Sequence, residues 1–241
     1  MYRTLIPDKI IATLEKLQDR ISERFPNSGL SNVCRELVGV ANESKAKAAA
    51  AGRPYYLLRI GTGLVLLLGL ALLGYVATII EVKRGAENLF GVLQGIEAAV
   101  NILVLTGAGV FFLATLESRW KRQQAFRELH QLQSIIHVVD MHQLTKDPSR
   151  ILSSGTPTSS SPDRPLTPFQ LIRYLDYCSE MLALAAKIAA LYAQATKDPV
   201  IIESTRGLEQ LTANLSSKIW QKIRLTQEMA DTGAARVSTP L

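Results

Sequence analysis

Cysteine, histidine and aromatic residues are scarce in this 241-residue chain, which contains two cysteines, three histidines and 6% aromatic residues. The isolated Cys34 and Cys178 match neither a disulfide framework nor a zinc-ligand pattern. We therefore interpret both as small apolar residues, buried in a protein that faces a reducing compartment.

Motifs that would indicate an enzyme are also missing. The sequence has no glycine-rich phosphate loop, no HExxH motif and no spacing that supports a Ser/His/Asp arrangement. His130 and His137 would lie about 10 Å apart along a helix, too far to share one metal ion, and His142 is badly placed relative to His137 and Asp140. We expect no enzymatic activity, no catalytic residue, no metal site and no cofactor, and we interpret these groups as polar contacts in a helical bundle.

Charge is absent from two long stretches of the chain. The 21 residues between Arg59 and Glu81 and the 19 residues between Glu97 and Glu117 carry none. A helix of roughly 20 apolar residues crosses the hydrocarbon core of a bilayer, which is about 30 Å thick. The sequence therefore predicts two transmembrane spans, at about 57–80 and 92–116, and is not that of a purely soluble protein.

Basic residues gather at one end of both predicted spans. They are Arg53 and Arg59 before the first span and Arg119, Lys121, Arg122 and Arg127 after the second, against Lys83 and Arg84 in the connector. Because Lys and Arg near the membrane ends set topology, we expect a multi-pass protein of the bacterial inner (plasma) membrane with both termini in the cytoplasm. The first apolar run begins near residue 57, so we expect an uncleaved insertion signal.

Apolar residues spaced by threes and fours predict amphipathic helices on the cytoplasmic side, and no segment has the pattern of a strand. We expect Thr167 to cap a helix that begins at Pro168. Such helices are marginal alone, so the predicted fold is an all-α membrane protein whose cytoplasmic helices form a bundle or coiled coil, within one chain or between the chains of a homo-oligomer. The predicted parts are N-terminal cytoplasmic helices (1–56), the transmembrane hairpin (57–116), a cytoplasmic extension of the second span (117–147), a flexible Ser/Pro linker (148–168), a C-terminal helical hairpin (169–230) and a disordered tail (231–241).

Polar residues interrupt the second predicted span along one face. Gln94, Glu97 and Asn101 occur at i, i+3 and i+7 and share that face. A ring of Glu97 side chains from several subunits would favour cations, and the apolar residues further along would form a constriction. The alternative is that Glu97 merely lies in the outer headgroup layer. The predicted pore-lining set is Gln94, Glu97, Asn101, Val104, Ala108, Phe111 and Thr115.

Small residues recur at intervals of four in both spans, as Gly91, Gly95 and Ala99 and as Gly74 and Thr78. Because small residues let membrane helices approach closely, we predict helix packing at these positions. Flexibility for gating is the alternative reading.

Cations and aromatic rings alternate in the last two predicted helices, a combination that can pair with phosphate and stack on bases. An ordinary solvated helix surface has the same residues, so both interpretations stay open. The residues of this candidate ligand site are Arg173, Tyr174, Tyr177, Lys218, Trp220, Lys222 and Arg224.

A basic chain of this size, with a two-span hairpin between short cytoplasmic helices, resembles the two-transmembrane pore-forming effectors of bacterial antiphage signalling systems, of the Hailong type or the cyclic-nucleotide type. The segment His137–Pro148 has the look of a family signature, although no known role attaches to it. The resemblance implies a homo-oligomer that senses a nucleotide or oligonucleotide made by a partner enzyme and then makes the inner membrane leak.

These observations predict an oligomeric inner-membrane ion channel or pore, of four or more subunits in contact with membrane lipid, gated by its cytoplasmic helices. The alternative is a membrane-anchored helical scaffold that recruits a soluble partner.

Overall fold

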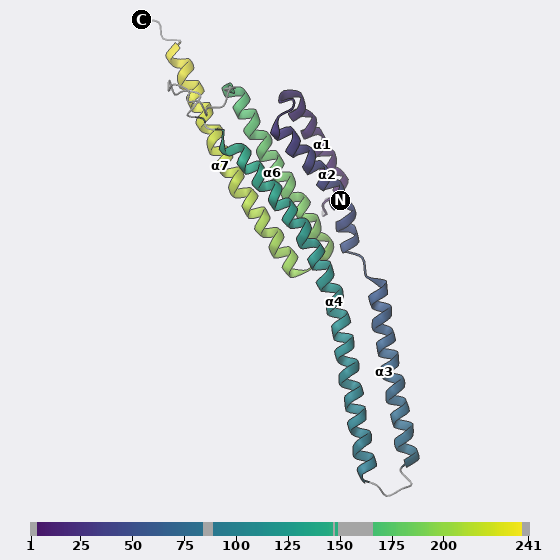
Figure 1. Cartoon of the computed structure of the whole chain (residues 1–241). Coiled ribbons are helices and arrows are strands. Elements are labelled where there is room, and N and C mark those ends of the chain that lie inside the picture. The colour runs from purple at the N-terminus through teal and green to yellow at the C-terminus, as the bar shows by residue number, and fades with distance from the viewer. Residues whose placement is uncertain (1–3, 84–88, 147, 149–165, 238–241) are drawn as a thin grey trace. The chain divides into compact units, whose positions relative to one another are not determined.

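The computed structural model describes residues 4–83, 89–146, 148 and 166–237, and all regular secondary structure within these ranges is α-helical (Figure 1). This confirms the predicted all-α class. The helices are α1 (Pro7–Arg24), α2 (Gly29–Ala51), α3 (Tyr56–Lys83), α4 (Leu89–Leu144), α6 (Pro168–Thr196) and α7 (Pro199–Val237). The chain divides into two compact units. We call Arg53–Gln124 the apolar hairpin, and Met1–Gly52 with Ala125–Leu241 the helical bundle.

Local side-chain chemistry explains where the helices of the bundle begin. Ser28 caps α2 by accepting a hydrogen bond from the Ser31 amide at 3.2 Å. Thr167 caps α6 in a reciprocal capping box with Gln170, as expected for the residue before Pro168. The Asp198 carboxylate accepts from the amides of Val200 and Ile201 at the start of α7.

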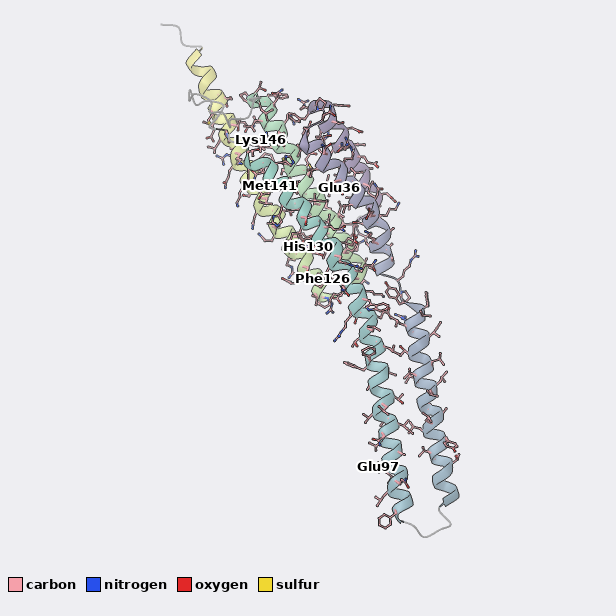
Figure 2. The ribbon with its side chains drawn as sticks, viewed as in Figure 1. Glu36, Glu97, Phe126, His130, Met141 and Lys146 are labelled. Atoms are coloured by element: carbon pink, nitrogen blue, oxygen red, sulfur yellow. The ribbon has the colours of Figure 1, made fainter. Side chains whose placement is uncertain are left out.

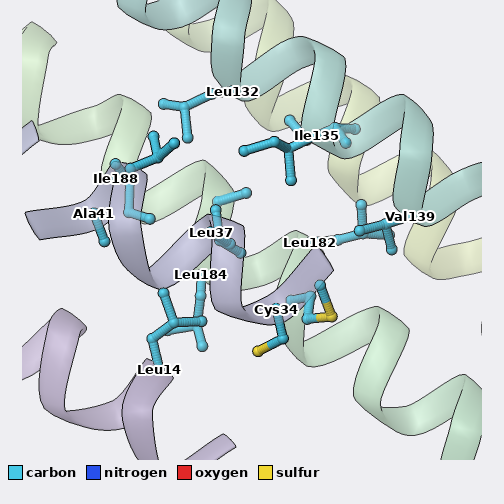
Figure 3. Packing of buried hydrophobic residues seen from close by; sticks show 14 of the residues in the cluster. Leu14, Cys34, Leu37, Ala41, Leu132, Ile135, Val139, Leu182, Leu184 and Ile188 are labelled. Atoms are coloured by element: carbon cyan, nitrogen blue, oxygen red, sulfur yellow. The ribbon is translucent and has the colours of Figure 1, made fainter. Parts of the chain in front are cut away.

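The helical bundle has one continuous apolar core. Side chains from α1, α2, α6, α7 and the C-terminal part of α4 pack into it, and Figure 3 shows Leu14, Leu37, Leu132 and Ile188 meeting from four helices. The apolar faces of these amphipathic helices are therefore covered within a single chain. Cys34 and Cys178 are buried as predicted, and burial raises the pKa of each thiol to about 12.

In the apolar hairpin, α3 runs antiparallel to the first part of α4. A β-carbon on Gly69 would overlap the Thr106 side chain, and one on Gly109 would lie 3.2 Å from Val65 Cγ1. Both helices are long and apolar enough to cross a membrane, and almost none of the residues in their most apolar stretches is buried by the chain.

The C-terminal helix is longer than the sequence pattern indicated. The predicted tail begins at residue 231, but α7 continues to Val237. Ala234 and Ala235 explain the difference, because alanine is the strongest helix former and sustains a helix after its apolar stripe has ended. Residues 238–241 of the predicted tail, and 149–165 of the predicted linker, lie outside the described residues.

Candidate functional site

The predicted pore-lining residues follow one another along the apolar part of α4. Gln94, Glu97 and Asn101 are exposed, and none of them has a hydrogen-bond or ion-pair partner among the described residues. Figure 2 labels Glu97 on this part of the helix. Val104, Ala108 and Phe111 are exposed as well. Thr115 is half-buried, and its hydroxyl donates to the backbone carbonyl of Phe111 at 2.9 Å. The single chain therefore leaves most of this stripe uncovered, and its role in lining a pore stays a prediction.

Two close approaches between α3 and α4 involve glycines outside the predicted four-residue repeats. They are Gly69 with Thr106 and Gly109 with Val65, whereas a β-carbon on Gly74 or Gly91 would meet no atom of the described residues within 4 Å. Gly95 and Ala99 are half-buried, and the exposed Thr78 hydroxyl donates to the Tyr75 carbonyl at 2.8 Å. Gly74 and Gly91 therefore have room for a neighbouring helix, and packing between chains at these positions stays a prediction.

A carboxylate joins the two helices at the base of the hairpin. Glu117 accepts hydrogen bonds from Lys121 Nζ at 2.8 Å and from the Tyr55 amide at 3.2 Å, and it forms an ion pair with Arg59 Nε at 3.6 Å. The hydrogen bond from Lys121 is the main cause that holds the pKa of Glu117 below its usual range. The contacts with Tyr55 and Arg59 tie the start of α3 to α4, and sequence spacing gave no sign of these two contacts.

The predicted ligand residues do not form one open site. Tyr174 and Tyr177 are buried and pack edge-on against Phe25, with ring centroids 5.4 and 6.3 Å away. Because both side chains are buried, neither ring is open to a stacking nucleobase. Lys222 donates to the backbone and side-chain oxygens of Gln143 at 2.8 and 2.7 Å.

The other four predicted ligand residues are on the surface of the bundle. Arg173 forms an ion pair with Asp176 at 3.3 Å, and Arg224 forms one with Glu228 at 3.6 Å. Lys218 and Trp220 are exposed on α7. Binding of an anionic ligand by these residues stays a prediction.

The signature-like segment at the end of α4 connects four helices of the bundle. Tyr174 Oη and His142 Nδ1 share a hydrogen bond of 3.3 Å, and Lys146 Nζ lies 5.0 Å from the centre of the Tyr174 ring. A β-carbon on Gly29, at the start of α2, would overlap the His142 ring. Burial, and then the positive charge of Lys146, lower the pKa of His142. Together with the contact between Gln143 and Lys222 of α7, these interactions make the segment a polar joint.

The joint and the base of the hairpin are two of the polar clusters that the described residues assemble from segments distant in sequence. Comparison of the chain with protein-family models, with curated proteins and with solved structures finds no match.

Proposed function

We propose that the protein is an oligomeric ion channel or pore of the bacterial inner membrane, in which α4 lines the conduction path. The observation that carries this proposal is the exposed stripe of Gln94, Glu97 and Asn101 in a part of α4, residues 93–114, whose other exposed residues are apolar or glycine. Polar and ionisable side chains are costly against hydrocarbon, so they face protein or water. A shared water-filled axis between several copies provides that environment.

The apolar residues that follow the stripe supply a gate. Val104 and Phe111 are both exposed on the same helix, and a ring of such side chains blocks ions by dewetting when it is narrow. One helix per subunit encloses a conduit only when several copies assemble, so we expect four or more subunits.

The helical bundle is the proposed control element. It contains the C-terminal part of α4, whose Leu132, Ile136 and Val139 are buried in the bundle core. A ligand that binds one packing of this core more tightly than another shifts the population of open channels. By the resemblance described above, the signal is a nucleotide or oligonucleotide made by a partner enzyme.

Electrical recording from reconstituted protein tests the proposal. Glu97→Gln is expected to lower the preference for cations, because the proposed mouth loses its negative charge. Asn101→Cys and Ala108→Cys are expected to allow block by a water-soluble thiol reagent. Leu103→Cys is the matched control, since Leu103 is exposed on another side of the same helix. The native thiols Cys34 and Cys178 are buried and provide little background.

Two results would contradict the channel. One is the absence of conductance in the wild type with or without nucleotides. The other is equal block of the Leu103→Cys, Asn101→Cys and Ala108→Cys variants, which would mean that no single side of α4 lines a path.

A second candidate function is a membrane-anchored scaffold. It is favoured by apolar side chains that the bundle leaves uncovered, of which Met141, labelled in Figure 2, is 63% exposed and Leu144 is 61% exposed. A scaffold would keep its function after the hairpin is exchanged for an unrelated two-helix anchor, whereas a channel would lose it.

A further inference from the structure

The base of the apolar hairpin has a strong excess of positive charge. Segments 53–59 and 117–124 together contain five cations and a single acid, Glu117. We call six of these residues the basic–aromatic band. Its members are Arg53, Tyr56, Arg59, Arg119, Trp120 and Lys121.

The single acid in these segments, Glu117, is already paired within the hairpin. Glu117 is bound by Lys121, Arg59 and the Tyr55 amide. Arg53 and Arg119 are exposed, and neither has an ion-pair partner in the part of the chain that the structure describes. Arg59 Nε lies 3.6 Å from a carboxylate oxygen of Glu117, while 64% of the Arg59 side chain stays exposed. The band therefore keeps guanidinium groups available for an external anion.

The band also has the aromatic and apolar surface that a lipid requires. Tyr56 is 71% exposed and Trp120 is 54% exposed, and amphipathic rings of this kind prefer the level of the headgroups. Directly beyond Tyr56, the side chains of Leu57 and Ile60 begin the exposed apolar surface of α3. A phospholipid whose phosphate is bound by the cations would thus place its acyl chains beside Leu57 and Ile60.

We propose that the basic–aromatic band binds the phosphate headgroup of an anionic phospholipid. Arg53 and Arg119 hold the charge, Arg59 adds a partly engaged guanidinium, and Trp120 and Tyr56 fix the depth of the headgroup. Arginine suits this task because its planar donors match the oxygen atoms of a phosphate. The inference rests on the membrane-spanning arrangement in the proposed function, but it does not require conduction.

Native mass spectrometry of the detergent-solubilised full chain tests the proposal, with phosphatidylglycerol as the anionic probe and phosphatidylcholine as the zwitterionic one. The wild type is expected to retain phosphatidylglycerol preferentially. The double variant Arg53→Gln/Arg119→Gln is expected to lose affinity by roughly five-fold for each charge removed, or about 25-fold in all. Arg53→Lys/Arg119→Lys keeps the charge and is expected to lose much less.

The matched control is Arg35→Gln/Arg206→Gln, which removes two exposed arginines from the bundle. Its affinity for phosphatidylglycerol is expected to stay within about two-fold of the wild type, because its charges lie outside the band. Equal retention of both lipids by the wild type would overturn the proposal, as would an equal loss in the two glutamine variants. Displacement of phosphatidylglycerol by the same concentration of soluble glycerol phosphate would also overturn it, because the ligand would then be the free phosphate.

Alkaline extraction of membranes separates this inference from the proposed function. If the chain is extracted as a peripheral protein, the membrane-spanning arrangement fails and the lipid site fails with it. If the chain stays in the membrane and shows no lipid preference, only the lipid site is overturned. A lipid preference without conductance supports the lipid site and counts against the channel.

Discussion

In the helical bundle the side chains of Leu132 and Ile188 are fully buried, whereas in the apolar hairpin Leu105 and Phe111 each keep 72% of their surface exposed. Both units are helical and both are rich in leucine and isoleucine. The bundle removes its apolar surface from water by packing five helical segments within one chain, which stabilises it by about 25 cal/mol for each Å² buried. The described residues of the hairpin form no such interior, and under the proposed function lipid or other copies of the chain cover its apolar surface.

The difference also changes what holds neighbouring helices together. In water the apolar stripes of the bundle drive association, but in hydrocarbon a leucine is as well solvated by lipid as by another helix. Close packing of small residues then matters more, and the hairpin contains such packing where Gly69 meets Thr106. The contrast between the two units therefore predicts opposite responses to matched substitutions.

Truncating a leucine should separate the two units most clearly. Leu132→Ala is expected to lower the free energy of unfolding of the bundle by about 2–5 kcal/mol, because a cavity remains in a packed core. Leu105→Ala is expected to change stability by no more than about 0.5 kcal/mol, since no packing inside the chain is lost. Thermal unfolding in detergent, followed by circular dichroism, measures both. Equal losses would mean that the hairpin surface is covered after all.

Introducing a charge should affect the hairpin more than the bundle. Leu105→Arg places a cation near the middle of the second predicted span, where insertion is disfavoured by about 2.5–3.5 kcal/mol. The fraction of protein that resists alkaline extraction is expected to fall. Gln133→Arg is the control, because Gln133 is exposed on the part of α4 that belongs to the bundle. If both variants stay fully membrane-bound, residue 105 does not lie in hydrocarbon.

Two glycines of α3 provide a finer test of the hairpin. Gly69→Ala is expected to destabilise the hairpin by about 1–3 kcal/mol, because the new β-carbon overlaps the Thr106 side chain. In the single chain Gly74→Ala is expected to be neutral or slightly stabilising, since its β-carbon meets no described atom within 4 Å, whereas a loss of stability would indicate the predicted packing between chains. The temperature of aggregation in detergent measures both effects. Adding Thr106→Ala to the Gly69→Ala variant is expected to restore part of the loss, and failure of this rescue would count against the contact.

The sequence was informative wherever the signal is local. Charge-free runs identified the two long apolar helices, and Thr167 before Pro168 identified the start of α6. The end of α7 was missed because helix propensity continues through Ala234 and Ala235 after the apolar stripe fades.

Contacts between distant segments could not be predicted in the same way. The register of α3 against α4 depends on how two helix surfaces fit together, so the spacing of Gly91 and Gly95 on one helix did not indicate that Gly69 meets Thr106. Likewise, Lys222 and Gln143 are 79 residues apart, and no local pattern indicates that they meet. The candidate ligand residues were chosen by composition, which does not distinguish the buried Tyr174 from the exposed Lys218.

Acid should give the smallest difference between the two units. Burial, and then Lys146, hold the pKa of His142 below its ordinary value of 6.5, so the unfolded chain takes up a proton at a higher pH than the folded bundle does. The bundle is therefore expected to lose stability as the pH falls below 6.5 and approaches the lower folded pKa. At the base of the hairpin, Lys121 lowers the pKa of Glu117 from 4.5, so these ion pairs stay complete above pH 4.5 and weaken only as the pH falls further.

Between pH 6.5 and 4.5 the melting temperature of the bundle is thus expected to fall. Over the same range the fluorescence of Trp120, which is close to Glu117 and Lys121 in the sequence, is expected to stay constant. This fluorescence is measured in the Trp220→Phe variant, which lacks the second tryptophan. His142→Gln is expected to flatten the pH dependence of the bundle, because the half-buried imidazole is removed, whereas His130→Gln is expected to leave it unchanged, since His130 is exposed. If His130→Gln flattened the curve and His142→Gln did not, the polar joint would not be the acid-sensitive part of the bundle. A fluorescence change at pH 6 would instead place the first response to acid in the hairpin and reverse the order in which the two units weaken.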